Sequence, residues 1–131
     1  SKRDRALEEV LRYEPPFQLV DRFVAQGTVL GGVELKRGDS VTAVVGSANR
    51  DPDAFDRPHV LDIERDSTHE PLTFGGGMHY CIGAPLARVM APAMLAELLT
   101  LNALAVDGRP QWGTDPYMRA MTNLPLSFRP T

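Results

Sequence analysis

The chain contains one cysteine, Cys81, which follows a glycine-rich segment with the sequence Phe74-Gly75-Gly76-Gly77-Met78-His79-Tyr80-Cys81-Ile82-Gly83. The hydrophobic pattern predicts that a long helix begins directly afterwards, at Ala84. The unpaired N–H groups and the positive dipole end at a helix start stabilise a thiolate relative to a thiol. Cys81 is therefore expected to be an anionic sulfur.

The three glycines before Cys81 permit a tight turn or bulge with positive φ, and they leave a flat backbone surface that a broad planar ligand can approach. His79 could direct a donor toward a carboxylate on such a ligand. A phosphate-binding loop is excluded, because the glycines lack the P-loop lysine and Tyr80 stands where the dinucleotide fingerprint needs glycine.

The residues alone leave other uses of Cys81 open. A lone cysteine is most often a buried structural thiol. Cys81 could also act as a nucleophile with a histidine base, or bind a metal together with His59, His69 and His79. These histidines are spaced ten residues apart and no Cys-x-x-Cys motif is present, which disfavours the metal site.

Elements predicted from periodicity must position this segment. A helix over Ala6–Tyr13 should end at Pro15 and Pro16. A small antiparallel sheet is predicted from four β-rich runs, Val20–Ala25, Thr28–Val29, Val33–Leu35 and Val41–Val45.

An ordered but irregular meander is expected between Asn49 and Thr73. The helix over Ala84–Leu101 has apolar residues around much of its circumference, which predicts burial on several sides. Pro92 inside it should cost about 3 kcal/mol or kink it. Tyr117–Phe128 suits a terminal edge hairpin.

Composition sets the broad class. A chain of 131 residues with 43% hydrophobic and 24% charged residues predicts a single folded unit, 1–131. A net charge of -3 indicates no nucleic-acid partner. One cysteine allows no intrachain disulfide, which favours a reducing, cytoplasmic setting. The longest apolar stretch, Ala91–Leu101, is too short for a membrane span.

The cysteine segment resembles, position for position, the haem-binding signature of the cytochrome P450 monooxygenases. The matching positions are Phe74, Gly77, the basic residue His79, Cys81 and Gly83. The following Ala84-Pro85-Leu86-Ala87-Arg88 is similar to the next helix of soluble bacterial members.

The resemblance extends over essentially the whole chain. Glu9 and Arg12 resemble the family's Glu-x-x-Arg pair, in which the two charges share a helix face and form a bridge that ties the helix to the meander. Further pieces follow in family order: Tyr13-Glu14-Pro15-Pro16, Arg22, Gly32, Gly38-Asp39, Ala48-Asn49-Arg50-Asp51-Pro52 and Leu61-Asp62-Ile63.

This resemblance implies an α+β fold, the C-terminal part of the mainly helical cytochrome P450 fold. It implies haem b as cofactor, with Cys81 as the axial thiolate and metal ligand. The residues expected to contact haem are Phe74, Gly75, Gly77, His79, Cys81, Gly83 and Arg22, with Arg22 and His79 facing the propionates. The substrate side is expected at Phe17, Gln18, Leu19, Ala120 and Met121.

The implied partners are a small organic substrate and a ferredoxin or flavoprotein electron donor on the face near Arg88. The chain resembles only the C-terminal third of such an enzyme, without the helix that delivers protons to bound oxygen. These 131 residues alone are therefore expected to be inactive, and to depend on an N-terminal portion or to self-associate. A degenerate fragment that serves as an interaction module is the alternative.

One departure concerns the Glu-x-x-Arg pair. Family members often place an arginine in the meander as a third partner, whereas this sequence has Pro58-His59-Val60-Leu61. His59, or no residue, is therefore expected to complete the group.

Overall fold

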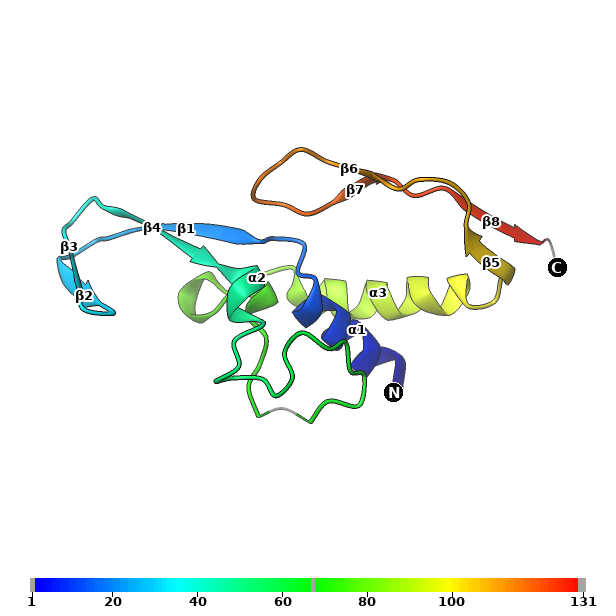
Figure 1. Cartoon of the computed structure of the whole chain (residues 1–131), viewed down its shortest axis with the longest axis horizontal. Coiled ribbons are helices and arrows are strands. Elements are labelled where there is room, and N and C mark those ends of the chain that lie inside the picture. The colour runs from blue at the N-terminus through cyan, green and yellow to red at the C-terminus, as the bar shows by residue number, and fades with distance from the viewer. Residues whose placement is uncertain (1, 67, 130–131) are drawn as a thin grey trace.

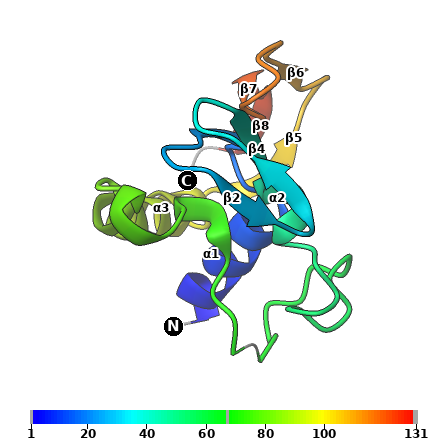
Figure 2. The ribbon, with the colours of Figure 1, turned by 90° about the vertical axis from the view of Figure 1, so that its left-hand side faces the viewer.

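The computed structural model describes residues 2–66 and 68–129. Small β-sheets lie on one side of two neighbouring helices, and the long meander lies on the other side (Figures 1 and 2). The elements in chain order are α1 (Lys2–Tyr13), β1 (Leu19–Phe23), β2 (Thr28–Leu30), β3 (Val33–Leu35), β4 (Ser40–Val44), α2 (Val45–Ala48), η1 (Leu72–Phe74), η2 (Gly77–His79), α3 (Ala84–Leu98), β5 (Asn102–Val106), β6 (Gln111–Trp112), β7 (Met121–Asn123) and β8 (Leu126–Arg129).

Helix α1 begins at Lys2, four residues before the predicted start, and ends at Tyr13 as predicted. The N–H of Glu14 still donates to the carbonyl of Val10 at 2.8 Å. The next donor in the helical ladder would be residue 15, and Pro15 has no N–H. The helix therefore stops at this point and leaves the carbonyl of Leu11 to another donor.

The pairing is antiparallel, as predicted, but the four strands form two separate two-stranded sheets and not one small sheet. Strand β1 pairs with β4 from Leu19↔Val44 to Phe23↔Ser40, and β2 pairs with β3. Gly31 and Gly32 form the tight β2–β3 turn with φ of 56° and 82°, which only glycine adopts without strain. The short helix α2 is not predicted from the sequence. The β-branched residues Val44 and Val45 favour a strand, although the chain enters a helix at Val45.

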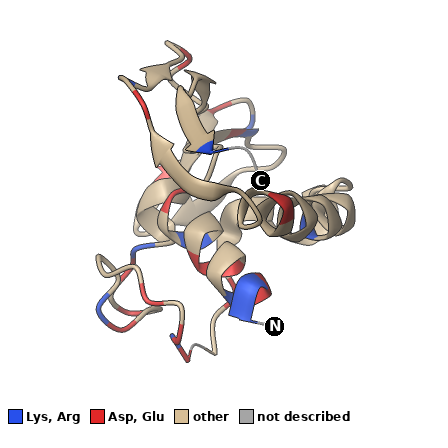
Figure 3. Cartoon of the chain, turned by 90° about the vertical axis from the view of Figure 1, so that its right-hand side faces the viewer, with Lys and Arg blue, Asp and Glu red and all other residues tan. Residues whose placement is uncertain are grey.

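Helix α3 runs through Pro92 and ends at Leu98, three residues before the predicted end. The prediction that it is buried on several sides is wrong, since Ala84 is its only buried residue. Helix α1 covers one face, where Leu7 and Leu11 approach Ala87 and Ala91. Large apolar side chains elsewhere on α3 are exposed, namely Leu86, Val89, Met90, Met94 and Leu98. Charged segments are more frequent on α1 and the meander than on α3 (Figure 3).

The terminal hairpin is longer than predicted. Strand β5 pairs with β8 and β6 pairs with β7, both antiparallel. The predicted range, Tyr117–Phe128, supplies only the return arm, and the outgoing arm starts at Asn102.

Few side chains in the described part of the chain are fully enclosed. The buried apolar residues are Pro15, Val45, Phe55 and Ala84, and the buried polar or charged ones are Glu9, Arg12 and Asn49. The centre of the unit is therefore a polar network between α1, α2 and the meander. In the described part of the chain, no helix combines the length and apolar character needed to cross a membrane.

Candidate functional site

The loop that carries Cys81 is closed by its own backbone. The N–H of Cys81 donates to the carbonyl of Phe74 at 2.9 Å, and the N–H of Tyr80 donates to Gly77 at 3.1 Å. Gly75 and Gly77 have φ of 75° and 62°, as the glycine spacing predicts, whereas Gly76 is extended. The turn between Phe74 and Cys81 thus depends on two glycines.

Cys81 is exposed, so the interpretation as a buried structural thiol is wrong. Its carbonyl accepts a hydrogen bond from the N–H of Ala84 at 3.1 Å, and the N–H of Ala87 donates to Gly83 at 2.9 Å. Gly83 is the N-terminal cap of α3 and has no capping side chain. Cys81 therefore stands two residues before the cap of α3, directly before the first helical turn, as the sequence predicts.

An apolar cavity of about 400 Å³ adjoins this sulfur. Five of the predicted site residues line it, namely Phe17, Arg22, Phe74, Gly75 and Cys81. The other lining residues are Leu11, Pro16, Val20, Leu72, Thr73, Ala87 and Ala91. The structure thus brings the glycine loop, strand β1, the end of α1 and α3 to one hollow.

The remaining predicted residues do not line this cavity. They are Gly77, His79, Gly83, Gln18, Leu19, Ala120 and Met121. Gln18 lines a separate concavity together with Trp112 and Arg119. Phe17 forms a β-bridge with Met118, which joins the segment before β1 to the terminal hairpin.

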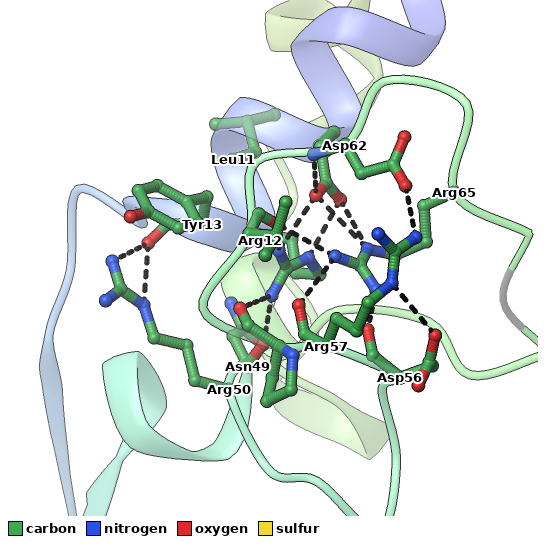
Figure 4. A network of polar contacts seen from close by, with 12 residues as sticks. Leu11, Arg12, Tyr13, Asn49, Arg50, Asp56, Arg57, Asp62 and Arg65 are labelled. Carbon is green, nitrogen blue, oxygen red and sulfur yellow. Dashed lines mark hydrogen bonds and ion pairs between the residues drawn. The ribbon is translucent and has the colours of Figure 1, made fainter.

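A buried ion pair lies between α1 and the meander, in the network of polar contacts that Figure 4 shows. Arg12 donates from Nε and Nη2 to the two carboxylate oxygens of Glu9, both at 2.8 Å. The predicted pair therefore shares one helix face and is buried. Arg12 also donates to the carbonyls of Asn49, Pro58 and Val60, which ties α1 to α2 and the meander.

The third partner of this pair is Arg65. Its Nε lies 3.1 Å from Oε1 of Glu9, and its side chain is only 8% exposed. The expectation that His59 fills this place, or that no residue does, is wrong. His59 is exposed. The carbonyls of Pro58 and Val60 on either side of it bond to Arg12, but the meander cation that reaches Glu9 is Arg65.

The pKa of Glu9 reflects opposing effects. Burial alone would raise it, but hydrogen bonds from Arg12, the Asp62 amide and Arg65 outweigh burial and hold the pKa below its ordinary value. Glu9 is therefore the ionised centre of a network that fixes α1 against the meander.

Arg88 connects the cysteine loop to both helices. Its Nε donates to Glu8 at 2.6 Å, its Nη1 donates to the hydroxyl of Tyr80 at 2.7 Å, and its guanidinium lies 4.8 Å from the ring centre of Phe74. These hydrogen bonds raise the pKa of Arg88. The residue is half-exposed and can support the loop while it faces solvent.

The alternative metal site is not formed. Within residues 2–66 and 68–129, no three histidine, cysteine, aspartate or glutamate side chains are grouped so that they could hold a metal ion. His69 instead packs edge-on against the ring of Phe55.

Sequence reasoning missed two residues of the network, Arg65 and Asn49. The meander has no periodicity that could indicate which of its charges turns inward. Asn49 belongs to the segment Ala48–Pro52, and nothing in the sequence of that segment indicates that its side chain is completely buried.

Comparison with known proteins identifies the family of the chain. The chain is 40% identical over 124 residues to "Cytochrome P450 109" of Bacillus spizizenii, covering 92% of this chain and 30% of the relative. It is 40% identical over 131 residues to "Cytochrome P450 monooxygenase PikC" of Streptomyces venezuelae, covering 96% and 31%. The chain thus spans about a third of the length of these curated relatives.

Solved structures of cytochromes P450 contain the same fold. The crystal structure of P450BioI in complex with a hexadec-9Z-enoic acid ligated acyl carrier protein matches with a TM-score of 0.90 and 35% identity, over 98% of this chain and 34% of that one. The cytochrome P450 family model matches residues 4–125, and the chain therefore belongs to the cytochrome P450 family.

Proposed function

We propose that this chain is the haem-binding portion of a cytochrome P450 monooxygenase, with Cys81 as the axial thiolate ligand. The observation that carries the proposal is the position of Cys81: its exposed sulfur stands at the start of α3, beside the apolar cavity. Cytochromes P450 bind haem b. When bound through a thiolate, this group supplies the chemistry that cleaves the O–O bond of dioxygen.

The residues present fit haem. A thiolate is a ligand suited to haem iron, and the cavity beside it has an almost wholly apolar wall. Arg22 contributes the cavity's one charged side chain and would face a propionate, with His79 as a second cation. Phe74, Gly75, Gly77 and Gly83 would shape the loop around the sulfur.

The substrate and partner assignments extend this proposal to the whole enzyme. Phe17, Gln18, Leu19, Ala120 and Met121 would border a small organic substrate. A ferredoxin or flavoprotein would deliver electrons near Arg88, in a cytoplasmic setting. The 131 residues alone would show no coupled turnover and would self-associate or require the rest of the enzyme, because proton delivery and a dry pocket belong to other segments.

An inactive fragment that serves as an interaction module is the second candidate. The exposed apolar side chains of α3 favour it, since a large apolar patch marks an interaction surface.

The ferrous carbon monoxide spectrum separates these candidates. Haem bound through Cys81 should give the strongly red-shifted Soret band of a thiolate ligand, and Cys81→His should abolish that shift. A band of imidazole type in the unmutated protein would reject the assignment, and absence of any haem binding would favour the interaction module.

A further inference from the structure

Asn49 is a fully buried polar residue at the end of α2, and both the oxygen and the nitrogen of its carboxamide form hydrogen bonds. Its Oδ1 accepts a hydrogen bond from the N–H of Leu72 at 2.7 Å. Its Nδ2 donates to the hydroxyl oxygen of Thr73 at 3.0 Å. One side chain therefore holds two successive residues of η1.

Thr73 also forms a hydrogen bond with α1. Its hydroxyl donates to the carbonyl of Leu11 at 2.8 Å. Because Pro15 has no N–H, this carbonyl lacks its helical donor, and the Thr73 hydroxyl takes that place. Arg50 caps the carbonyl of Tyr13 similarly, at 2.6 Å.

The backbone of Asn49 is itself anchored. Its carbonyl accepts a hydrogen bond from Nη1 of Arg12 at 2.8 Å, and its N–H donates to Val45 at 2.9 Å. The Glu9–Arg12 pair thus fixes Asn49, and Asn49 fixes the chain at Leu72 and Thr73.

The hydrogen bonds of Asn49 and Thr73 form a clamp on η1, and the chain runs from this clamp directly to the loop of Cys81. Phe74, the residue after Thr73, accepts the hydrogen bond from the Cys81 N–H at 2.9 Å. Thr73, Phe74 and Cys81 line the same cavity. A shift of Thr73 would move the backbone acceptor that holds Cys81.

We propose that Asn49 and Thr73 are positioning residues for Cys81. Their hydrogen bonds transmit the geometry of the buried Glu9–Arg12 pair to the loop that presents the sulfur. The clamp fixes the position of the Phe74–Cys81 loop whether or not haem is bound. Its effect on iron ligation by Cys81 rests on the function proposed above.

The test compares the full chain with Thr73→Val, which keeps the side-chain shape and removes the hydroxyl. Thr73→Ser restores the hydroxyl, and Thr122→Val is the matched control, because Thr122 donates to the Gln111 carbonyl in the terminal hairpin. Hydrogen exchange of the Leu72 and Cys81 amides is measured in haem-free protein. The thiolate-ligated fraction is measured separately, from the ferrous carbon monoxide band.

Thr73→Val should speed exchange at both amides by about 10- to 100-fold, the effect of leaving a buried donor unpaired, while exchange within α1 stays unchanged. It should also lower the thiolate-ligated fraction, and Thr73→Ser should restore both readouts. Uniformly faster exchange across the chain, or amides as slow as in the unmutated protein, would overturn the proposal.

If Thr73→Val does not fold, Thr73→Ala makes the same comparison without placing a second methyl group against Asn49. If the unmutated protein lacks thiolate-ligated haem, the proposed function fails. The amide exchange rates still decide whether the clamp exists.

Discussion

The Nε atom of Arg65 lies 3.1 Å from Oε1 of Glu9, the same carboxylate that Arg12 binds at 2.8 Å. This contact joins residues 56 positions apart and closes the meander onto α1. Arg65 also donates to the carbonyls of Asp56, Arg57 and Val60. The meander is therefore held by a charged centre in place of a large apolar core.

Arg65→Ala should lower the free energy of unfolding by about 2 kcal/mol, because Glu9 loses one of its two cations in a buried setting. His59→Ala should change it by less than about 0.5 kcal/mol, since His59 is exposed. Urea unfolding of the full chain measures both. A larger loss from His59→Ala than from Arg65→Ala would contradict the assignment of the third partner.

Arg12→Ala should be more damaging, with a loss of about 3–5 kcal/mol. It removes a nearly inaccessible guanidinium and leaves three backbone carbonyls without its donors. Glu9→Ala should cost a similar amount, because two arginines then lack their carboxylate. Thermal unfolding is the measurement, and an unchanged melting temperature in either variant would mean that the pair contributes no stability.

Stability should fall in acid. Burial would raise the pKa of Glu9, but the hydrogen bonds from Arg12, Asp62 and Arg65 lower it below the ordinary value of 4.5. The unfolded chain thus binds the proton more readily, so the stabilisation is present above pH 4.5 and is lost as the pH falls through the pKa of the folded state. Unfolding free energies measured against pH should show this slope.

Glu9→Gln should flatten that slope. Glu64→Gln is the control, because Glu64 is an exposed carboxylate paired with Arg5. An equal flattening by both variants would indicate a general charge effect and not the Glu9 network.

Arg22 should contribute to haem affinity, since it is the charged residue of the cavity wall. Arg22→Ala should weaken binding by about tenfold, or about 1.4 kcal/mol, through loss of one charge-assisted hydrogen bond. A haem titration followed by absorbance measures this effect. Arg119→Ala is the control, because Arg119 pairs with Glu14 outside the cavity, and equal affinities for all three proteins would remove Arg22 from the site.

Local patterns predicted much of the fold. Pro15 and Pro16 marked the end of α1, and the glycine spacing indicated the positive φ angles of the cysteine loop. Long-range contacts were less accessible. Nothing local distinguishes Arg65 from the other charges of the meander, and the burial of Asn49 depends on residues 23 and 24 positions away.

The exposed face of α3 illustrates a different limit. Apolar periodicity around Val89 and Met94 indicates that these side chains avoid water, but it does not say which segment covers them. The prediction of burial assumed that the chain supplied its own cover, and the structure shows that α1 covers only one face.

The proposed bond between the Cys81 sulfur and haem iron can be measured by iron X-ray absorption spectroscopy of the haem-loaded protein. The spectrum should show one sulfur neighbour at about 2.3 Å, a usual metal–thiolate distance, and Cys81→Ser should remove it. A spectrum with only nitrogen or oxygen neighbours in the unmutated protein would show that Cys81 is not the iron ligand.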